Sequence, residues 1–185
     1  MKLKAKLMDE NNIKRALTRI SYEIIENTHN IENLVLLGVH TRGIPMAERI
    51  SSFIETHASK FDLTSVKAPV GKLDISFYRD DVTRLSESPE VNGTDVPFDV
   101  TGKDVVIVDD VLYTGRTARA ALEATFSLGR PRTIRLAILI DRGHRELPIR
   151  ADFVGKNVPT STKELIKVHL TEIDGVDDVE LYENV

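Results

Sequence analysis

Residues 105–117 combine the residue types that bind a phosphorylated sugar. The β-branched run at 105–108 predicts a strand buried on both faces, and it ends in two adjacent carboxylates, Asp109 and Asp110. A short loop containing Gly115 then leads into a predicted helix. Glycine lets backbone N–H groups approach a phosphate closely, and the N-terminus of a helix attracts anions. Carboxylates accept hydrogen bonds from sugar hydroxyls, so the stretch predicts a phosphosugar site at the carboxyl end of a strand.

A second strand–loop–helix unit carries a candidate anion ligand. The apolar run at 34–39 predicts another buried strand, and Thr41, Arg42 and Gly43 follow it. Pro45 suits the first turn of the next helix, and arginine is a fork-shaped donor for phosphate oxygens. An ordinary turn with a surface arginine is the alternative. Because residues 105–117 already predict a phosphosugar site, we favour phosphate binding by Arg42.

The remaining segments predict a single α/β domain over residues 1–185. Strands and helices alternate along the chain, which favours a mainly parallel central sheet with helices on both faces. Residues 9–29 predict an amphipathic helix with Asp9 as its N-cap, and further strands are expected at 70–78, 134–140, 165–170 and 179–182. Residues 79–102 have no periodicity and many polar, Gly and Pro residues. A loop of this length predicts a mobile lid, with a floppy hairpin as the alternative.

Composition restricts the classes of function. The net charge of −4 over 185 residues argues against broad, sequence-independent nucleic-acid binding, although a local basic patch is compatible with it. The absence of cysteine excludes disulfides, thiolate metal sites and a cysteine nucleophile. No run approaches the roughly 18 apolar residues of a membrane span, and no apolar segment of a secretory signal follows the N-terminus. We therefore expect a cytoplasmic protein without a membrane partner.

Both loops resemble motifs of the type I phosphoribosyltransferases. Residues 105–117 resemble the family's phosphoribosyl pyrophosphate (PRPP) motif, and residues 41–43 resemble its pyrophosphate loop. The resemblance implies the type I phosphoribosyltransferase fold, with a small hood subdomain at about 141–161 over the base and a flexible lid at about 79–102. It also implies a non-proline cis peptide in the pyrophosphate loop, and Mg²⁺ held mainly through PRPP and water rather than by a protein metal site.

The same resemblance implies roles for individual residues. Asp109 and Asp110 would hold the ribose hydroxyls, and Arg42 with Arg79 would stabilise the leaving pyrophosphate, which makes these four the candidate catalytic residues. Val158 would contact the base, with Phe153 behind it. The complete predicted set that binds PRPP or UMP is Thr41, Arg42, Asp109, Asp110, Val111, Leu112, Tyr113, Thr114, Gly115, Arg116, Thr117, Arg142 and Val158.

Further segments narrow the resemblance to one bacterial group. Residues 15–20, 78–81, 141–150 and 155–161 resemble regulators of pyrimidine-operon attenuation that are also uracil phosphoribosyltransferases. That likeness implies a UMP- or UTP-responsive protein that binds the operon's leader mRNA, converts uracil and PRPP to UMP and pyrophosphate, and forms a homodimer or higher homo-oligomer. The implied RNA-binding residues are Thr18, Arg19, His144, Arg145, Arg150, Lys156 and Thr160.

Two other functions stay open. One is a plain salvage phosphoribosyltransferase for uracil or a purine base, in which the basic residues form only a solvated surface. Purine-specific relatives often have a carboxylate where this chain has Tyr113, which weakens the purine hypothesis. The other is a PRPP-sensing DNA regulator without catalytic activity, but such proteins usually add a helix-turn-helix domain, for which the eight residues before the first predicted helix are too few.

Overall fold

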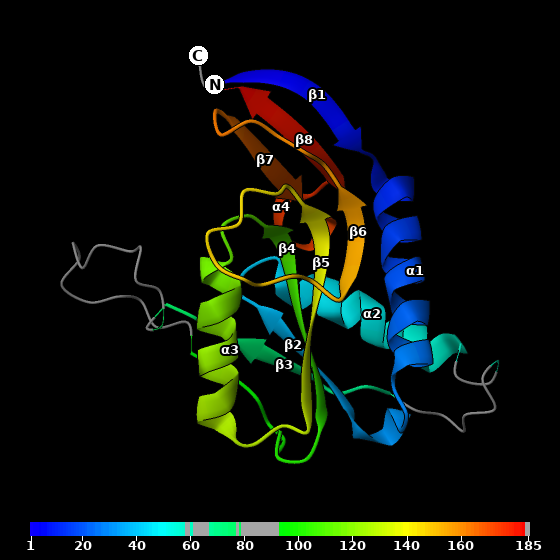
Figure 1. Cartoon of the computed structure of the whole chain (residues 1–185). Coiled ribbons are helices and arrows are strands. Elements are labelled where there is room, and N and C mark those ends of the chain that lie inside the picture. Colours follow the sequence, from blue (N-terminus) through cyan, green and yellow to red (C-terminus); the bar gives the residue numbers. More distant parts are fainter. Residues whose placement is uncertain (58–59, 61–66, 77, 79–92, 184–185) are drawn as a thin grey trace.

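A five-stranded parallel sheet forms the centre of the protein in the computed structural model (Figure 1). The structure describes the chain except for residues 58–59, 61–66, 77, 79–92 and 184–185. The strand order is β3-β2-β4-β5-β6, and each neighbouring pair is parallel. The strands are β2 (Leu34–Val39), β3 (Val70–Leu73), β4 (Asp104–Leu112), β5 (Thr133–Asp141) and β6 (Phe153–Asn157).

Helices cover both faces of this sheet, as alternation of the elements predicts. Helices α1 (Glu10–Asn27) and α2 (Gly43–His57) pack against each other and against one face, where they share an apolar core with β2, β4 and β6. Helix α3 (Arg116–Leu128) covers the other face (Figure 1). A short 3-10 helix, η1 (Ile31–Asn33), precedes β2. Both faces of β2 and β4 are therefore buried, which explains their continuous apolar runs.

The strand order places a ligand crevice between β2 and β4. From β2 the chain continues through α2 to β3 on one side, whereas from β4 it continues through α3 to β5 on the other. In open α/β sheets, ligands bind outside the carboxyl ends of the strands at such a reversal of order. The predicted pyrophosphate loop follows β2 and the predicted PRPP loop follows β4, so the topology brings the two loops to the same crevice.

A second, smaller sheet joins the two ends of the chain. Its antiparallel order is β1 (Lys2–Met8), β8 (Asp178–Glu183), β7 (Glu164–His169), and the four-residue helix α4 (Thr171–Asp174) lies between β7 and β8. The sequence interpretation missed β1, although Lys2, Lys4 and Lys6 alternate with apolar residues at the period of a strand. The small sheet lies beyond the carboxyl ends of the central strands, above the crevice (Figure 1).

Most predicted elements are confirmed, with corrections at their bounds. Asp9 caps α1: its carboxylate accepts a hydrogen bond from Asn12 N at 2.8 Å, and Asp9 N donates to Asn12 Oδ1 at 3.2 Å. The strand expected at 70–78 ends at Leu73, where the carboxylate of Asp74 accepts from Ser76 N at 2.8 Å and turns the chain. No helix among the described residues is long and apolar enough to cross a membrane.

The boundaries expected for the hood and the lid need correction. Of the proposed hood, β6 is a strand of the central sheet rather than of a separate subdomain, because the side chain of Phe153 is buried in the main core. The small sheet is instead built from β1, β7 and β8. Within the proposed lid, residues 79–92, including Arg79, lie outside the described residues. Asp95 exchanges two backbone hydrogen bonds with Lys72 and Val100 is buried, so this end of the segment is packed on the core.

Candidate functional site

The predicted PRPP loop encloses a cavity of about 300 Å³ at the carboxyl end of β4. Eight of the predicted residues line it together with Ala118 and Ile138; the eight are Asp109, Val111, Leu112, Tyr113, Thr114, Gly115, Arg116 and Thr117. These residues come from one strand end, one loop and the first turn of α3. The local order strand–loop–helix is therefore sufficient to form the cavity.

The two adjacent carboxylates differ in their surroundings. Asp109 is buried and accepts a hydrogen bond from Asp110 N at 2.9 Å, whereas Asp110 is half-buried and accepts from Val111 N at 2.9 Å. Burial raises the pKa of Asp110, and the positive charge of Arg42 acts in the opposite direction. Arg42 is thus close enough to stabilise the ionised form of Asp110, which is the form that accepts hydrogen bonds from hydroxyl groups.

The backbone around Gly115 provides donors for an anion. Gly115 has a φ of +96°, in the left-handed region that favours glycine, and it precedes α3 without a side-chain cap. The first N–H groups of a helix have no partner within the helix, and the residues of this first turn, Arg116 to Ala118, line the cavity. The Thr114 hydroxyl already accepts from Arg116 N at 3.3 Å and keeps the turn tight.

The second loop places Arg42 beside a carboxylate of α4, the short helix between β7 and β8 of the small sheet. The peptide bond between His40 and Thr41 is cis, as the resemblance implies. Thr41 is exposed, and Arg42 Nη2 donates to Asp174 Oδ1 at 2.8 Å. Sequence reasoning missed Asp174, because its partner lies 132 residues away along the chain. The run of acidic residues from Glu172 onward was the signal available in the sequence.

The segment after β5 clamps the PRPP loop. Arg145 Nη1 donates to Tyr113 O at 2.6 Å, and Glu146 N and Leu147 N donate to Thr114 O at 2.9 and 3.2 Å. The Glu146 carboxylate also pairs with Arg116 at 2.8 Å. Arg145, which the resemblance associates with RNA, therefore lies in contact with the loop expected to bind nucleotide.

Arg142 ties this loop to the segment after β6. Its side chain is buried, and the guanidinium lies 4.0 Å from the ring centroid of Tyr113. Arg142 Nε donates to Thr160 Oγ1 at 3.0 Å and Nη2 to Glu164 O at 2.8 Å. Burial lowers the pKa of Arg142. Val158 packs against the core beside this cluster, and its N–H donates to Asp141 O at 2.8 Å.

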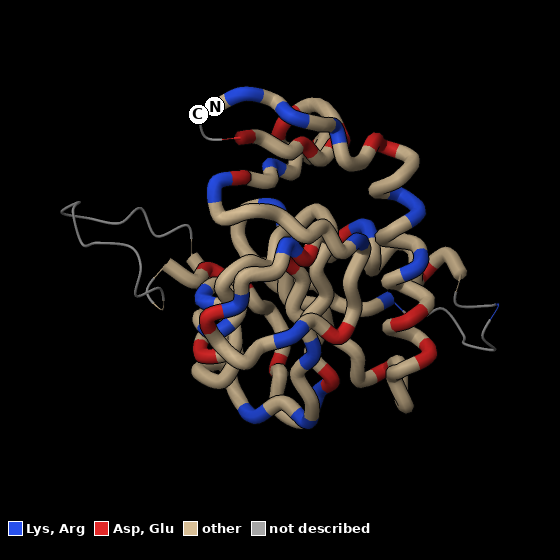
Figure 2. The backbone as a smooth tube through the Cα atoms, turned by 45° about the horizontal axis from the view of Figure 1, so that its top comes forward, with Lys and Arg blue, Asp and Glu red and all other residues tan. Residues whose placement is uncertain are grey.

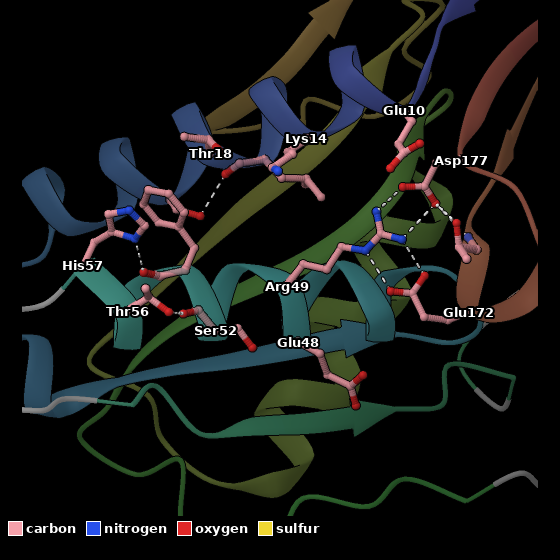
Figure 3. Close-up of a pocket in the computed structure, with 14 residues that line it drawn as sticks. Glu10, Lys14, Thr18, Glu48, Arg49, Ser52, Thr56, His57, Glu172 and Asp177 are labelled. Atoms are coloured by element: carbon pink, nitrogen blue, oxygen red, sulfur yellow. Dashed lines mark hydrogen bonds and ion pairs between the residues drawn. The ribbon is translucent and has the colours of Figure 1, made fainter.

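The predicted RNA-binding residues fall into separate groups. Arg19 and Lys156 line a groove of about 370 Å³ between α1 and β6, where Arg19 Nη2 donates to Gly155 O at 2.6 Å. The ring nitrogen Nε2 of His144 contacts the backbone oxygen of Thr160, which lies shortly after the end of β6. The structure does not bring Thr18 or Arg150 into these groups. Thr18 lines a groove between α1 and α2 (Figure 3), and Arg150 lines a small cavity with α3.

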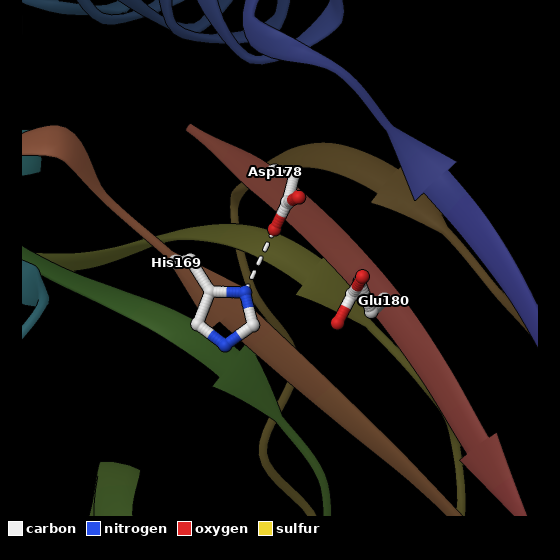
Figure 4. A group of neighbouring side chains, drawn as sticks. All are labelled: His169, Asp178 and Glu180. Carbon is white, nitrogen blue, oxygen red and sulfur yellow. Dashed lines mark hydrogen bonds and ion pairs between the residues drawn. The ribbon is translucent and has the colours of Figure 1, made fainter. Parts of the chain in front are cut away.

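Two further features lie outside this site. The groove of about 720 Å³ between α1 and α2 contains Arg49, which is paired with Glu172 and Asp177 at 2.6 Å each (Figure 3). His169, Asp178 and Glu180 cluster on β7 and β8 (Figure 4). Asp178 there accepts from His169 at 2.7 Å and pairs with Lys6 at 3.0 Å. Acidic and basic positions are interspersed over most of the described backbone (Figure 2), whereas the charged residues from Glu172 onward are all acidic.

Comparison with known proteins identifies the class to which this fold and cavity belong. Residues 5–172 match the sequence model of the phosphoribosyl transferase domain. The hypoxanthine phosphoribosyltransferase of Trypanosoma cruzi has a similar fold, with a TM-score of 0.70 and 18% identity over 98% of this chain and 97% of that one. The Staphylococcus aureus hypoxanthine phosphoribosyltransferase gives 0.69 and 20%, over 96% and 92%. The chain therefore belongs to the phosphoribosyltransferase family and has its type I fold.

Much closer relatives place the chain within that family. "Bifunctional protein PyrR" of Clostridium perfringens is 58% identical over 184 residues, which cover all of both chains. The protein of the same name from Thermus thermophilus is 58% identical over 183 residues, covering 99% and 98%. The chain thus belongs to the PyrR proteins, and the prediction of a bifunctional pyrimidine regulator and uracil phosphoribosyltransferase is confirmed at this level.

Proposed function

We propose that the cavity at 109–117 binds the ribose 5′-phosphate part of PRPP or UMP, and that Arg42 binds the pyrophosphate of PRPP. The observation that carries this proposal is the convergence of the two loops at the crevice between β2 and β4. Asp109 and Asp110 would accept hydrogen bonds from the ribose hydroxyls, and the N–H groups at the start of α3 would bind the phosphate. The remaining residues of the predicted set, Thr41 and Val111 to Thr117, would surround these groups.

The reaction would join uracil to ribose with departure of pyrophosphate. Uracil N1 would attack C1′ of PRPP, and the bond from C1′ to the pyrophosphate oxygen would break as negative charge develops on the leaving group. Arg42 would stabilise that charge. Val158 and Arg142, beside Tyr113, would face the base. Arg79 retains its proposed role at the pyrophosphate, although it lies outside the described residues.

The residues at this site fit a magnesium ion bound with PRPP. Asp109 supplies a carboxylate at the cavity wall, and Asp110 supplies a second carboxylate directly after it in β4. Magnesium prefers oxygen ligands while keeping several of its waters. When bound, the ion would neutralise part of the charge on pyrophosphate. Asp109 and Asp110 would then orient the ribose hydroxyls, and Arg42 would orient the far phosphate.

The same nucleotide site would regulate RNA binding. We assign leader-mRNA contacts to the α1–β6 groove with Arg19 and Lys156, and to His144 and Thr160 beyond β6; Thr18, Arg145 and Arg150 remain candidates. The residues around 141–149 contact both the PRPP loop and this surface, so UMP or UTP bound in the loop would strengthen RNA binding. Bound RNA would strengthen nucleotide binding by the same factor. A homodimer would double the RNA surface.

The test of the transferase proposal is an assay of the purified chain with PRPP and each of uracil, hypoxanthine and guanine. We expect UMP formation from uracil, and its loss in Asp109→Asn, whose amide cannot serve as an anionic acceptor. Turnover of a purine base in place of uracil would favour the salvage alternative. Turnover of uracil at an unchanged rate in Asp109→Asn would contradict the assigned role.

The RNA surface is tested with Lys156→Ala and a matched control, Lys103→Ala, at the opposite end of the central sheet. Removing one phosphate contact should weaken leader-RNA binding and reduce the slope of log affinity against log salt by about 0.7 to 0.9. Lys103→Ala should leave both unchanged. Equal effects of the two substitutions would show that only net charge matters, and not the α1–β6 groove.

A further inference from the structure

The ion pair between Arg42 and Asp174 connects the predicted pyrophosphate loop to the small sheet. Arg42 follows β2, whereas Asp174 ends α4 between β7 and β8. Arg42 Nη2 and Asp174 Oδ1 are 2.8 Å apart, and their side chains are 31% and 21% exposed. The second oxygen of Asp174 accepts from Leu170 N at 2.9 Å. The carboxylate is therefore held in one position by its own helix and directed at the arginine.

Arg42 keeps donor capacity that this pair does not use. Its Nε is buried and has no hydrogen-bond partner among the residues that the structure describes. A guanidinium carries five N–H donors arranged to bind two oxygens at once. In the ion pair with Asp174, Arg42 donates through Nη2 alone. The geometry thus suits a larger anion with several oxygens better than it suits a single carboxylate oxygen.

The charge of Asp174 lies where a ligand anion is expected. Arg42 Nη2 donates to this carboxylate at 2.8 Å, and the positive charge of Arg42 also opposes the rise that burial causes in the pKa of Asp110. Desolvation opposes the ionisation of Asp174, but Leu170 N and Arg42 together hold the pKa of Asp174 below its usual value. Asp174 is consequently negative at neutral pH, and an anion that binds Arg42 must either displace this carboxylate or share the guanidinium with it.

We propose that Asp174 is a positioning residue that competes with pyrophosphate for Arg42, and so weakens the binding of PRPP and pyrophosphate without affecting UMP. This inference rests on the proposed function. UMP has no pyrophosphate group, so the affinity for UMP does not depend on the competition between Asp174 and pyrophosphate for Arg42. In the transferase reaction, the carboxylate of Asp174 would speed the release of pyrophosphate, because it can form its ion pair with Arg42 again as the product leaves.

The size of the effect follows from the charges. Removing one negative charge a few ångströms from a polyanion, at a partly exposed site screened by salt, changes binding by about fivefold. Asp174→Asn is the suitable substitution, because the amide oxygen still accepts from Leu170 N while the charge is lost. Asp174→Glu keeps the charge. Glu172→Gln is the matched control, since Glu172 lies on the same short helix but pairs with Arg49 instead.

The experiment is calorimetric titration of the full chain and these variants with magnesium pyrophosphate, PRPP and UMP. We expect Asp174→Asn to bind pyrophosphate and PRPP about fivefold more tightly and UMP within twofold of wild type. Asp174→Glu and Glu172→Gln should resemble wild type for all three ligands. If Asp174→Asn does not fold, as judged by thermal unfolding, Asp174→Ser keeps an oxygen acceptor and makes the same test.

Two results would overturn the inference. One is unchanged or weaker binding of pyrophosphate by Asp174→Asn, which would mean that the carboxylate orients Arg42 for the ligand rather than competing with it. The other is an equal gain in Glu172→Gln, which would reflect only the general charge of the region. A wild-type chain that binds neither PRPP nor pyrophosphate would instead refute the proposed function, and the inference with it.

Discussion

Arg145 has two alternative roles: it contacts RNA directly, or it holds the PRPP loop in place. The resemblance implies that this side chain binds RNA, yet the structure directs it at backbone oxygens. Its Nη1 donates to Tyr113 O at 2.6 Å and Leu112 O at 3.3 Å, and its Nε donates to Ile149 O at 3.0 Å. Nη2 also pairs with the carboxylate of Asp141. We predict that Arg145→Ala weakens nucleotide binding, because the loop loses its clamp.

The contacts give the expected magnitude. A hydrogen bond from a charged donor contributes about 1.5 to 3 kcal/mol when buried, but the Arg145 side chain is 21% exposed and water can replace part of the loss. We therefore expect the free energy of unfolding to fall by about 2 to 3 kcal/mol for the whole set. The affinity for UMP should fall about tenfold, equivalent to about 1.4 kcal/mol, because binding must then order residues 112–116.

The assay combines three measurements on Arg145→Ala. Denaturant unfolding gives the stability, calorimetry gives the UMP affinity, and a gel shift with leader RNA at saturating UMP gives the RNA affinity. Arg130→Ala is the control, since Arg130 is an exposed arginine just before β5, at the opposite end of that strand from Arg145. We expect saturating UMP to restore most RNA binding to Arg145→Ala. Unchanged UMP affinity with lost RNA binding would refute this reasoning and assign Arg145 to the RNA contact.

Two other predictions concern the frame of the site. Arg49 and hydrogen bonds from Thr171 lower the pKa of Asp177 from 3.8 to about 2, so Asp177 stabilises the fold above its unfolded pKa and loses this contribution as pH falls from about 4 to 2. Asp177→Asn should lower the unfolding free energy by about 2 kcal/mol at pH 7, and the difference from wild type should shrink in urea titrations over that acid range; a pH-independent difference would contradict the assignment. In Gly43→Ala, the new Cβ would lie 2.2 Å from Val108 O, which forces β2 and α2 away from β4. We expect PRPP binding below detection and a loss of several kcal/mol of stability, about 3 or more, and binding at wild-type affinity would show that the two loops are not rigidly coupled.

The cavity at residues 109–117 was predictable because the residues that form it are close together in the sequence. The strand end, the acidic pair and the glycine at residue 115 lie within thirteen consecutive residues, and each type restricts what the backbone can do there. The burial of β4 on both faces follows in the same way from its β-branched run. Asp9 as a helix cap is another local prediction that the structure confirms.

The parts that were not predicted depend on partners distant in sequence. β1 is a strand because it pairs with β8 at the other end of the chain, and β6 belongs to the central sheet because it pairs with β5 and buries Phe153. The pairing of Arg42 with Asp174 spans 132 residues. Periodicity reports which face of a segment is apolar, but it does not report which surface covers that face.

The central claim is that one nucleotide site serves both catalysis and RNA recognition. The most direct test is a gel shift of a pyrimidine-operon leader RNA with the purified full chain, at moderate salt, with and without saturating UMP. The account predicts that UMP tightens RNA binding, and that Asp109→Asn abolishes the UMP effect while leaving the UMP-free affinity unchanged. RNA binding that is absent, or that is the same with and without UMP, would contradict it.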